Sequence, residues 1–413
     1  MPTPVTVFTN GTIITPFRLI ENGTVVIEGE RIKAVGSKEE IPIPAHAKII
    51  NVSGDFISPG FIDLHLHGAW GGDVMSASLE DLSKMSRGLV RNGVTAFLPT
   101  TLTGPLSDIE NALNCIQHAQ THGFCHGAKI LGAHLEGPFI NREQKGAQNP
   151  QYIVKPNKEV YIPLLEKHPC IVRLSAAPEV PGSLELGQEL KKRKIVASIA
   201  HSNATYTEVL KAIEAGYSHV THMFSSMSGI QRINAYRIAG VIESTLLLDE
   251  LTTEMIADGH HLPPSLMKLV LKTKGNDKVC LVTDAMSAAG LGPGRFKLGK
   301  TEVIIEDNVP ECFEVSGRDT FCVAKTTDRS SFASSVTTMD KMVKNMINLL
   351  GLNIIQSIQL VTVNPARMQM LDDEIGILSP GMKADLTVFN KQIDVQLTMV
   401  DGKIVFQNTK QNR

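Results

Sequence analysis

Both ends of the chain consist of short apolar segments separated by turn residues. Seven such segments occur, at residues 5–8, 11–14, 23–27, 33–35, 385–389, 397–400 and 403–406. Apolar runs of this length, bounded by Asn, Gly, Asp and charged residues, are typical of β-strands. We therefore predict a small β-sandwich domain built from both termini, residues 1–55 and 372–413.

The middle of the chain, residues 56–371, alternates strand-like and helix-like patterns. Eight apolar segments are typical of buried strands: residues 56–66, 96–100, 130–135, 171–176, 196–200, 218–221, 253–257 and 279–283. Stretches with helical spacing lie between them, among them residues 79–92, 184–194 and 207–216. This alternation indicates an α/β fold, and eight units favour a (β/α)8 TIM barrel over an open doubly wound sheet.

Two histidines mark the end of the first of these strands. His65 and His67 are separated by one residue, and positions i and i+2 of a strand point to the same face. Both imidazoles can therefore reach one ion, and neutral imidazole is the commonest metal ligand in proteins. Two histidines alone do not make a site, so other strands have to supply partners.

Polar and ionisable residues recur where the other predicted strands end. Besides His65 and His67, they are Thr100, Thr101, His134, Glu136, Glu179, His201, His222, Asp258, His261 and Asp284. In a TIM barrel the carboxyl ends of all strands open on one face, where catalysis takes place. We therefore expect residues far apart in the sequence to converge on one site.

Several of these residues have an ordinary structural alternative. His201 or His222 alone would more often be a buried structural histidine, but together they follow consecutive strands. Glu136 would otherwise be a helix cap or an ion-pair partner, although glycine and proline follow it directly. His134 is either a ligand or a donor behind a ligand. Asp284 is either a helix N-cap or the general base that a hydrolytic water needs.

Composition and charge exclude other classes of function. The 413 residues carry a formal net charge of −2, with 40 Lys and Arg against 42 Asp and Glu. The mixture of signs predicts no nucleic-acid partner and no membrane-surface patch. No apolar run is long enough to cross a bilayer, and residues 1–16 lack the pattern of a signal peptide. We expect a cytoplasmic protein.

The predicted ligands are four histidines and two carboxylates, without thiolate. Such donors suit zinc, iron, manganese, cobalt or nickel. A bound ion of this kind lowers the pKa of water to about 7 and polarises a scissile carbonyl. The sequence thus predicts a metal-dependent hydrolase. A non-catalytic scaffold is the less favoured alternative, because a scaffold does not need the full ligand set.

Six short strings connect these residues to a known family. They are HLEGPF at residues 134–139, KGAQ at 145–148, AHSNA at 200–204, THMF at 221–224, ADGHH at 257–261 and LVTDA at 281–285. As a set they resemble the amidohydrolase superfamily, TIM-barrel metal hydrolases with a β-sandwich domain. Within it the chain resembles the N-acetylglucosamine-6-phosphate deacetylases along essentially its whole length. Residues 174–179 contain no lysine, whereas many other amidohydrolases carry a carbamylated lysine there.

The resemblance implies a divalent metal cofactor. Glu136, His201 and His222 would hold the principal ion. His65 and His67 would support a second ion, which only some members of the family bind. One or two ions per subunit are thus implied, with zinc as the first expectation and iron, manganese, cobalt or nickel as alternatives.

The resemblance also implies the course of a reaction. Asp284 would take a proton from the nucleophilic water and pass it to the leaving amine, and His261 would polarise the acetyl carbonyl. Gln148 would meet sugar hydroxyls. The products would be glucosamine 6-phosphate and acetate, and the enzyme would act in amino-sugar catabolism as a homodimer.

One segment departs from the family pattern. After the strand-six histidine the family usually has Asn-Ala-Met and then Arg-Glu-Pro-Gly, which bind the sugar phosphate, the arginine coming from the neighbouring subunit. Here Ser225 and Ser226 stand first, and the nearest arginine is Arg232, with Arg237 as a rival. Serine hydroxyls and an arginine fork can bind phosphate oxygens. The departure leaves a deacylase of a different N-acylated sugar or amino compound as the alternative function.

Overall fold

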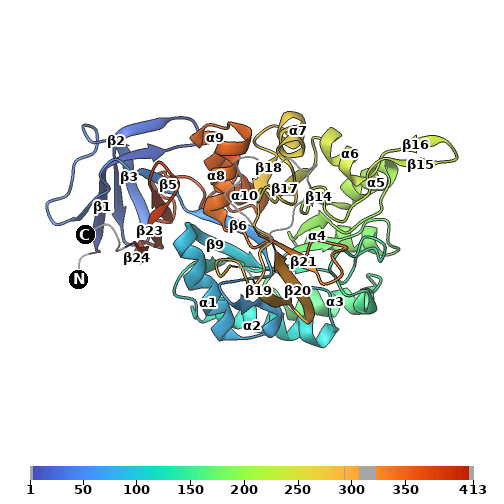
Figure 1. Ribbon diagram of the computed structural model, residues 1–413. Coiled ribbons are helices and arrows are strands. Elements are labelled where there is room, and N and C mark those ends of the chain that lie inside the picture. The colour runs from blue at the N-terminus through green and yellow to red at the C-terminus, as the bar shows by residue number, and fades with distance from the viewer. Residues whose placement is uncertain (1–2, 293, 307–321, 409–413) are drawn as a thin grey trace.

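The structure is a computed structural model that describes residues 3–292, 294–306 and 322–408; the outermost residues of the predicted terminal domain, 1–2 and 409–413, lie outside it. Strands from both termini form one eight-stranded sheet at one end of the molecule (Figure 1). They are β1 (Val5–Ile14), β2 (Leu19–Glu28), β3 (Arg31–Ser37), β4 (Lys48–Asn51), β5 (Phe56–Pro59), β22 (Leu386–Phe389), β23 (Val395–Val400) and β24 (Lys403–Gln407). Their order is β24-β23-β22-β5-β1-β2-β3, with β4 beside β1, so N- and C-terminal segments meet where β5 pairs with β22.

The segment 56–66, predicted as one strand, is divided at Gly60. Its first part is β5, in the terminal sheet, and its second part, β6 (Phe61–Leu66), pairs with a parallel strand of the middle region. A Cβ at residue 60 would lie 2.0 Å from Oγ1 of Thr95, so only glycine leaves room for the Thr95 side chain here. The prediction of a single strand was wrong, because one glycine among apolar residues does not reveal that the chain passes here from one sheet into another.

Parallel strands fill the middle of the chain. With β6 they are β9 (Val94–Pro99), β10 (Lys129–Ile130), β11 (Ala133–Glu136), β12 (Ile171–Ala176), β13 (Val196–Ile199), β14 (Tyr217–Val220), β17 (Thr252–Met255) and β18 (Val279–Leu281). One sheet has the order β10-β9-β6 and the other β11-β12-β13-β14-β17-β18. Every residue of β6, β9, β11, β13 and β18 is buried, as expected for parallel strands covered on both faces. The predicted α/β fold is confirmed, and its parallel strands form a curled sheet.

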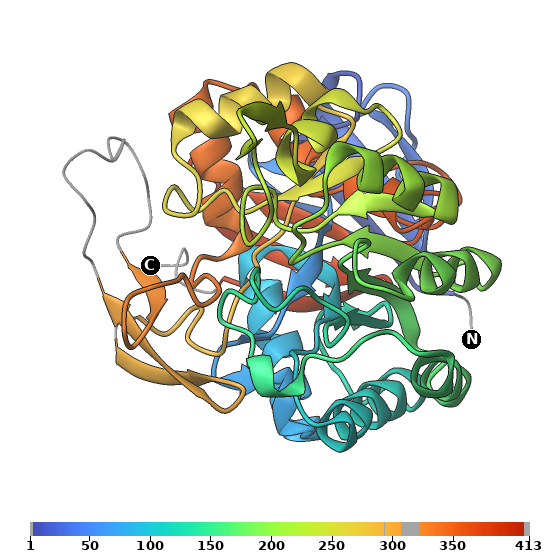
Figure 2. The ribbon, with the colours of Figure 1, turned by 90° about the vertical axis from the view of Figure 1, so that its right-hand side faces the viewer.

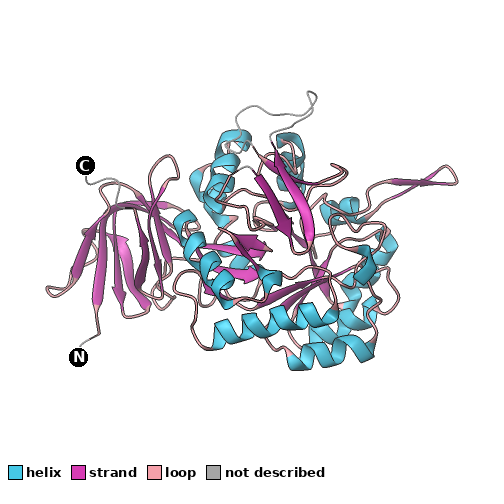
Figure 3. Cartoon of the chain, turned by 60° about the horizontal axis from the view of Figure 1, so that its bottom comes forward, coloured by secondary structure: helices cyan, strands magenta, loops and turns pink. Residues whose placement is uncertain are grey.

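Helices surround these strands (Figures 2 and 3). They are α1 (Leu79–Leu89), α2 (Leu106–Thr121), α3 (Lys158–Lys167), α4 (Ser183–Lys192), α5 (Tyr206–Ala215), α6 (Val241–Leu247), α7 (Pro264–Lys274), α8 (Met339–Leu350), α9 (Ile354–Gln359) and α10 (Val363–Met368). Both ends of α5 are capped. The backbone N–H of Thr205, before α5, donates to Glu208 at 2.8 Å, and Gly216 follows the helix as its C-cap with a left-handed φ of 108°.

None of the described helices is both long and apolar enough to cross a bilayer.

Three small sheets lie outside this frame. The hairpin of β15 (Gln231–Ile233) and β16 (Tyr236–Ile238) projects from the body of the protein (Figure 1). The strands β19 (Gly294–Leu298), β20 (Thr301–Glu306) and β21 (Val323–Thr326) form an antiparallel sheet that packs on Leu102 and Met286. A short pair, β7 (Gly68–Ala69) and β8 (Gly72–Asp73), follows His67.

Candidate active site

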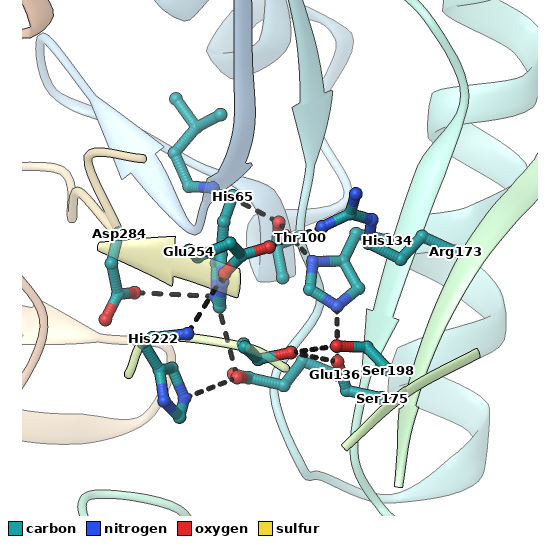
Figure 4. Close-up of polar contacts among 12 residues, drawn as sticks. His65, Thr100, His134, Glu136, Arg173, Ser175, Ser198, His222, Glu254 and Asp284 are labelled. Atoms are coloured by element: carbon teal, nitrogen blue, oxygen red, sulfur yellow. Dashed lines mark hydrogen bonds and ion pairs between the residues drawn. The ribbon is translucent and has the colours of Figure 1, made fainter. Parts of the chain in front are cut away.

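Two groups of three potential metal ligands lie at the carboxyl ends of the parallel strands. The first consists of Glu136, His201 and His222, and the second of His65, His67 and Asp284. All six residues are buried, and within each group the ligand atoms lie within 4.8 Å of one another. Figure 4 shows His65, Glu136, His222 and Asp284 converging from different strands. The strand ends thus bring six distant residues to one place.

The backbone at three of these residues is strained. His201, His222 and Asp284 follow the ends of β13, β14 and β18, and their φ angles are 47°, 29° and 44°. Non-glycine residues rarely adopt this left-handed region, and they do so mostly where the surrounding structure enforces it. Here the backbone N–H of Asp284 donates to the carbonyl of His65 at 2.8 Å, which fixes the end of β18 against β6. All three side chains contribute to the two ligand groups at the carboxyl ends of the strands.

Glu136 stands between the two groups. Its Oε1 lies 3.0 Å from Nε2 of His222 and 3.6 Å from Nε2 of His65, and its Oε2 lies 3.4 Å from Nε2 of His67. Burial alone would raise the pKa of Glu136, but His65 and hydrogen bonds from His201 and His222 hold it well below its ordinary range. The carboxylate is therefore ionised and can serve either group.

The hydrogen bonds of the histidines fit a bound metal ion. Nδ1 of His65, His67 and His201 contacts, respectively, a carboxylate oxygen of Glu254 (2.9 Å), the carbonyl of Thr100 (3.1 Å) and the carbonyl of Gln144 (2.7 Å). These oxygens only accept, so Nδ1 carries a proton, and Nε2 presents a lone pair whenever the ring is neutral. The Nε2 atoms of His65 and His67 are 3.4 Å apart, and those of His201 and His222 are 3.3 Å apart. Two ring nitrogens at these distances can share one metal ion.

The acidic surroundings of His67 favour positive charge in the same place. Burial would lower the pKa of His67, but hydrogen bonds with Asp284 and Glu136 raise it to about 9. A divalent ion would neutralise the same two carboxylates that a protonated His67 ring neutralises. It would therefore compete with that proton for the ring nitrogen. The donor set therefore fits a divalent metal.

His261 and Asp258 form an imidazole–carboxylate pair beside the two ligand groups. Nδ1 of His261 lies 2.7 Å from Oδ2 of Asp258, whose Oδ1 accepts the backbone N–H groups of His260 and His261 at 2.8 Å. Burial would raise the pKa of Asp258, but His261 brings it to about 2. Conversely, burial would lower the pKa of His261, and Asp258 raises it. His261 is thus held in one orientation and kept ready to donate a hydrogen bond.

A cavity of about 300 Å³ opens onto these groups. Residues from both ligand groups line it, together with His261, Gln148, Ser225, Ser226, Phe224 and Phe332. Gln148, predicted to meet sugar hydroxyls, is already engaged: its Nε2 donates to Oε2 of Glu136 at 2.9 Å, and its Oε1 accepts the N–H of Thr103 at 2.7 Å. The structure therefore shows Gln148 as a hydrogen-bond partner of Glu136.

The two candidate phosphate-binding arginines lie elsewhere. Arg232 and Arg237 face each other across the β15–β16 hairpin, are exposed and do not line the cavity of their own chain. Nη1 of Arg237 donates to the carbonyl of Ala235 at 3.0 Å. Glu179, another strand-end carboxylate, also lies outside the cavity lining and binds the N–H of Asn203 at 2.6 Å.

Two buried charged residues lie behind the ligand groups and were not predicted from the sequence. Glu254 in β17 contacts Nδ1 of His65, and Arg173 in β12 forms an ion pair with Glu254. Both side chains are fully buried. A charged residue inside a predicted buried strand was the available signal, because such residues are almost never buried without a partner.

Comparison with known proteins places this site in a family. The sequence model of the amidohydrolase family matches residues 56–405. This chain belongs to the amidohydrolase family. An N-acetylglucosamine-6-phosphate deacetylase of Bacillus subtilis (strain 168) is 32% identical to this amidohydrolase over 398 residues, which are 95% of each protein. An N-acetylgalactosamine-6-phosphate deacetylase of Escherichia coli O157:H7 is 31% identical, over 88% of this chain and 90% of that protein.

A solved structure agrees with the sequence comparison. The crystal structure of N-acetylglucosamine-6-phosphate deacetylase from Pasteurella multocida matches this amidohydrolase with a TM-score of 0.87 and 28% identity, covering 98% of this chain and 100% of that one. The resemblance predicted from the sequence is thereby confirmed.

Proposed function

We propose that this amidohydrolase hydrolyses the N-acetyl group of N-acetylglucosamine 6-phosphate and releases glucosamine 6-phosphate and acetate. The observation that carries the proposal is one cavity lined by residues of both ligand groups, Asp284 among them, and by His261. The names of its relatives supply the substrate class. A sugar phosphate is charged and does not cross a bilayer unaided, so we also propose that the enzyme works in the cytoplasm, where such a substrate is retained.

Two metal sites are part of this proposal. Glu136, His201 and His222 would hold one divalent ion, and His65, His67 and Asp284 a second, with zinc the first expectation for these N and O donors. Such an ion, when bound, would polarise the acetyl carbonyl and lower the pKa of water.

The protein's own groups move the protons. Burial would raise the pKa of Asp284, but His65 and His67 lower it, so the carboxylate is ionised at neutral pH and can accept a proton from water. His261 donates a hydrogen bond to the acetyl oxygen as negative charge develops there. Water adds to the carbonyl carbon, the C–N bond breaks, and Asp284 returns the proton to the amine.

Asp258→Asn tests the role assigned to His261. Asp258 raises the pKa of His261, so the protonated ring persists to higher pH in the native enzyme. The variant lowers that pKa, and the alkaline limb of kcat/KM is expected to move to lower pH, with kcat/KM reduced about 10-fold or more. A pH–rate profile measures the shift; an unchanged alkaline limb would contradict protonated His261 as the donor.

The parallel strands are proposed to close into a (β/α)8 barrel. Two parallel bridges support this arrangement: Thr100 pairs with His134 at one junction of the two sheets, and Leu66 pairs with Ala285 at the other. We further propose that the terminal sheet is a β-sandwich domain of residues 1–55 and 372–413, joined to the barrel domain, residues 56–371. Because β5, residues 56–59, pairs with β22 of the terminal sheet, these residues would belong to the β-sandwich domain and not to the barrel domain.

The β15–β16 hairpin is proposed to complete the site of a second subunit in a homodimer. It carries exposed apolar side chains, Ile233 and Tyr236, which are 50% and 75% exposed. Exposed apolar groups of this size favour a protein contact. The hairpin would carry Arg232 to the phosphate of a substrate in the neighbouring subunit, near Ser225 and Ser226.

Arg232→Ala is therefore expected to raise KM for the phosphorylated substrate about 10- to 100-fold with little change in kcat, because charge-assisted hydrogen bonds to phosphate are lost. Arg237→Ala, whose guanidinium already binds Ala235, is the matched variant and should raise KM less. Steady-state kinetics with the sugar phosphate measures both, and a larger effect at Arg237 would reverse the assignment.

The proposed function is tested by acetate release from zinc-loaded protein. The panel contains N-acetylglucosamine 6-phosphate, its galactosamine epimer and unphosphorylated N-acetylglucosamine. We expect the highest kcat/KM with N-acetylglucosamine 6-phosphate. A clear preference for either other sugar would replace the proposed substrate, and no acetate from any of them would refute the deacetylase proposal.

A further inference from the structure

Glu254 lies directly behind both ligand groups, although the chemistry proposed above gives it no role. Its side chain is fully buried in β17. Its Oε2 lies 2.9 Å from Nδ1 of His65 and accepts the backbone N–H of His222 at 3.2 Å (Figure 4). One carboxylate oxygen thus contacts a ligand of each group.

His65 differs from the other ligand histidines in what stands behind it. Nδ1 of His67 and of His201 donates to a backbone carbonyl, and Nδ1 of His222 has no partner among the described residues. A carboxylate behind a ligating histidine fixes the tautomer and raises the basicity of the opposite nitrogen more than a neutral carbonyl does. The orientation of His65 toward the cation site therefore depends on Glu254.

Arg173 holds the other oxygen of the same carboxylate. Nη1 of Arg173 contacts Oε1 of Glu254, and Nε of Arg173 donates to Oε1 of Gln369 at 3.2 Å. This buried ion pair compensates the charge of Glu254 and fixes the plane of its carboxylate. Oε2 is consequently left free for His65 and His222.

We propose that Glu254, held by Arg173, is a positioning residue that couples the two metal sites. It presents Nε2 of His65 to one ion and anchors the strained backbone of His222 beside the other. The inference rests on the proposed metal-dependent function, because it concerns how this chain holds its ions.

The decisive comparison separates this role from a purely structural ion pair. Glu254→Gln removes the charge behind His65 but leaves Arg173 buried without a counter-charge, so it lowers the melting temperature as well as metal affinity. The double variant Arg173→Gln with Glu254→Gln removes both charges. Melting of the metal-free proteins and zinc competition with a chelator are measured for wild type and both variants.

We expect Glu254→Gln to raise the zinc dissociation constant about 10- to 100-fold. The double variant should recover much of the lost melting temperature but none of the lost zinc affinity. Wild-type zinc affinity in either variant would overturn the proposal. Failure of the native protein to bind zinc, or cobalt or iron in its place, would instead refute the metal-dependent function.

A measurement on the native protein covers the case in which Glu254→Gln does not fold. In the ¹⁵N-histidine spectrum, His65 is expected to carry a proton on Nδ1 whether or not zinc is bound, protected from solvent exchange by Glu254. An unprotonated Nδ1 on His65 would overturn the proposal without any variant.

Discussion

Asp284→Asn is expected to lower kcat for acetate release about 10²- to 10⁴-fold, the usual contribution of a general base. Asp284 is 8% exposed, so the cavity reaches its carboxylate, which lies 3.2 Å from Nε2 of His67. The asparagine keeps an oxygen that can contact a metal ion, but its amide cannot accept the proton of water. KM should therefore change much less than kcat.

Ser334→Ala is the matched control for this variant. The Ser334 hydroxyl lies 3.5 Å from Oδ1 of Asp284, a long contact, so its loss should leave kcat within a few-fold of the native value. Zinc analysis accompanies both variants. If Asp284→Asn keeps kcat within 10-fold of native while its zinc content is unchanged, another group acts as the base.

Glu136→Gln is expected to abolish stoichiometric metal binding and reduce acetate release to background. Glu136 is the carboxylate that lies within 3.6 Å of a histidine Nε2 in both groups, so its charge serves both proposed ions. Substitution of a residue that hydrogen-bonds to a metal ligand raises the dissociation constant about 10- to 100-fold. Loss of Glu136, a ligand itself, should raise the zinc dissociation constant by more than that. Metal analysis of the purified variant and a zinc titration followed by activity measure the effect.

Glu179→Gln provides the same chemical change outside the cavity. Glu179 binds the hydroxyl of Ser202 at 2.7 Å and the N–H of Asn203 at 2.6 Å. This control should keep its zinc and its activity, whatever it loses in stability. Equal zinc content in Glu136→Gln and Glu179→Gln would show that Glu136 is not a ligand.

Most of the parallel strands could be predicted because strands such as β6, β9 and β13 are buried on both faces and are therefore rich in apolar residues. The convergence of His65, Glu136, His201 and Asp284 followed from the fact that parallel strands end on the same side. The structure brings these four together, while their catalytic roles remain proposals.

Other features depend on contacts that one strand does not reveal. Arg173 and Glu254 are each unusual within a buried strand, but nothing in either segment says that the two meet. The left-handed backbone at His222 is imposed by its surroundings against the preference of its residue type. The β15–β16 hairpin was missed because its short strands are exposed and lack the apolar pattern of a core.

Anomalous diffraction from crystals of the zinc-loaded enzyme would locate the bound ion. We predict a zinc peak about 2.0–2.2 Å from Nε2 of His201, Nε2 of His222 and a carboxylate oxygen of Glu136. A fully active enzyme with no metal among these three residues would contradict it.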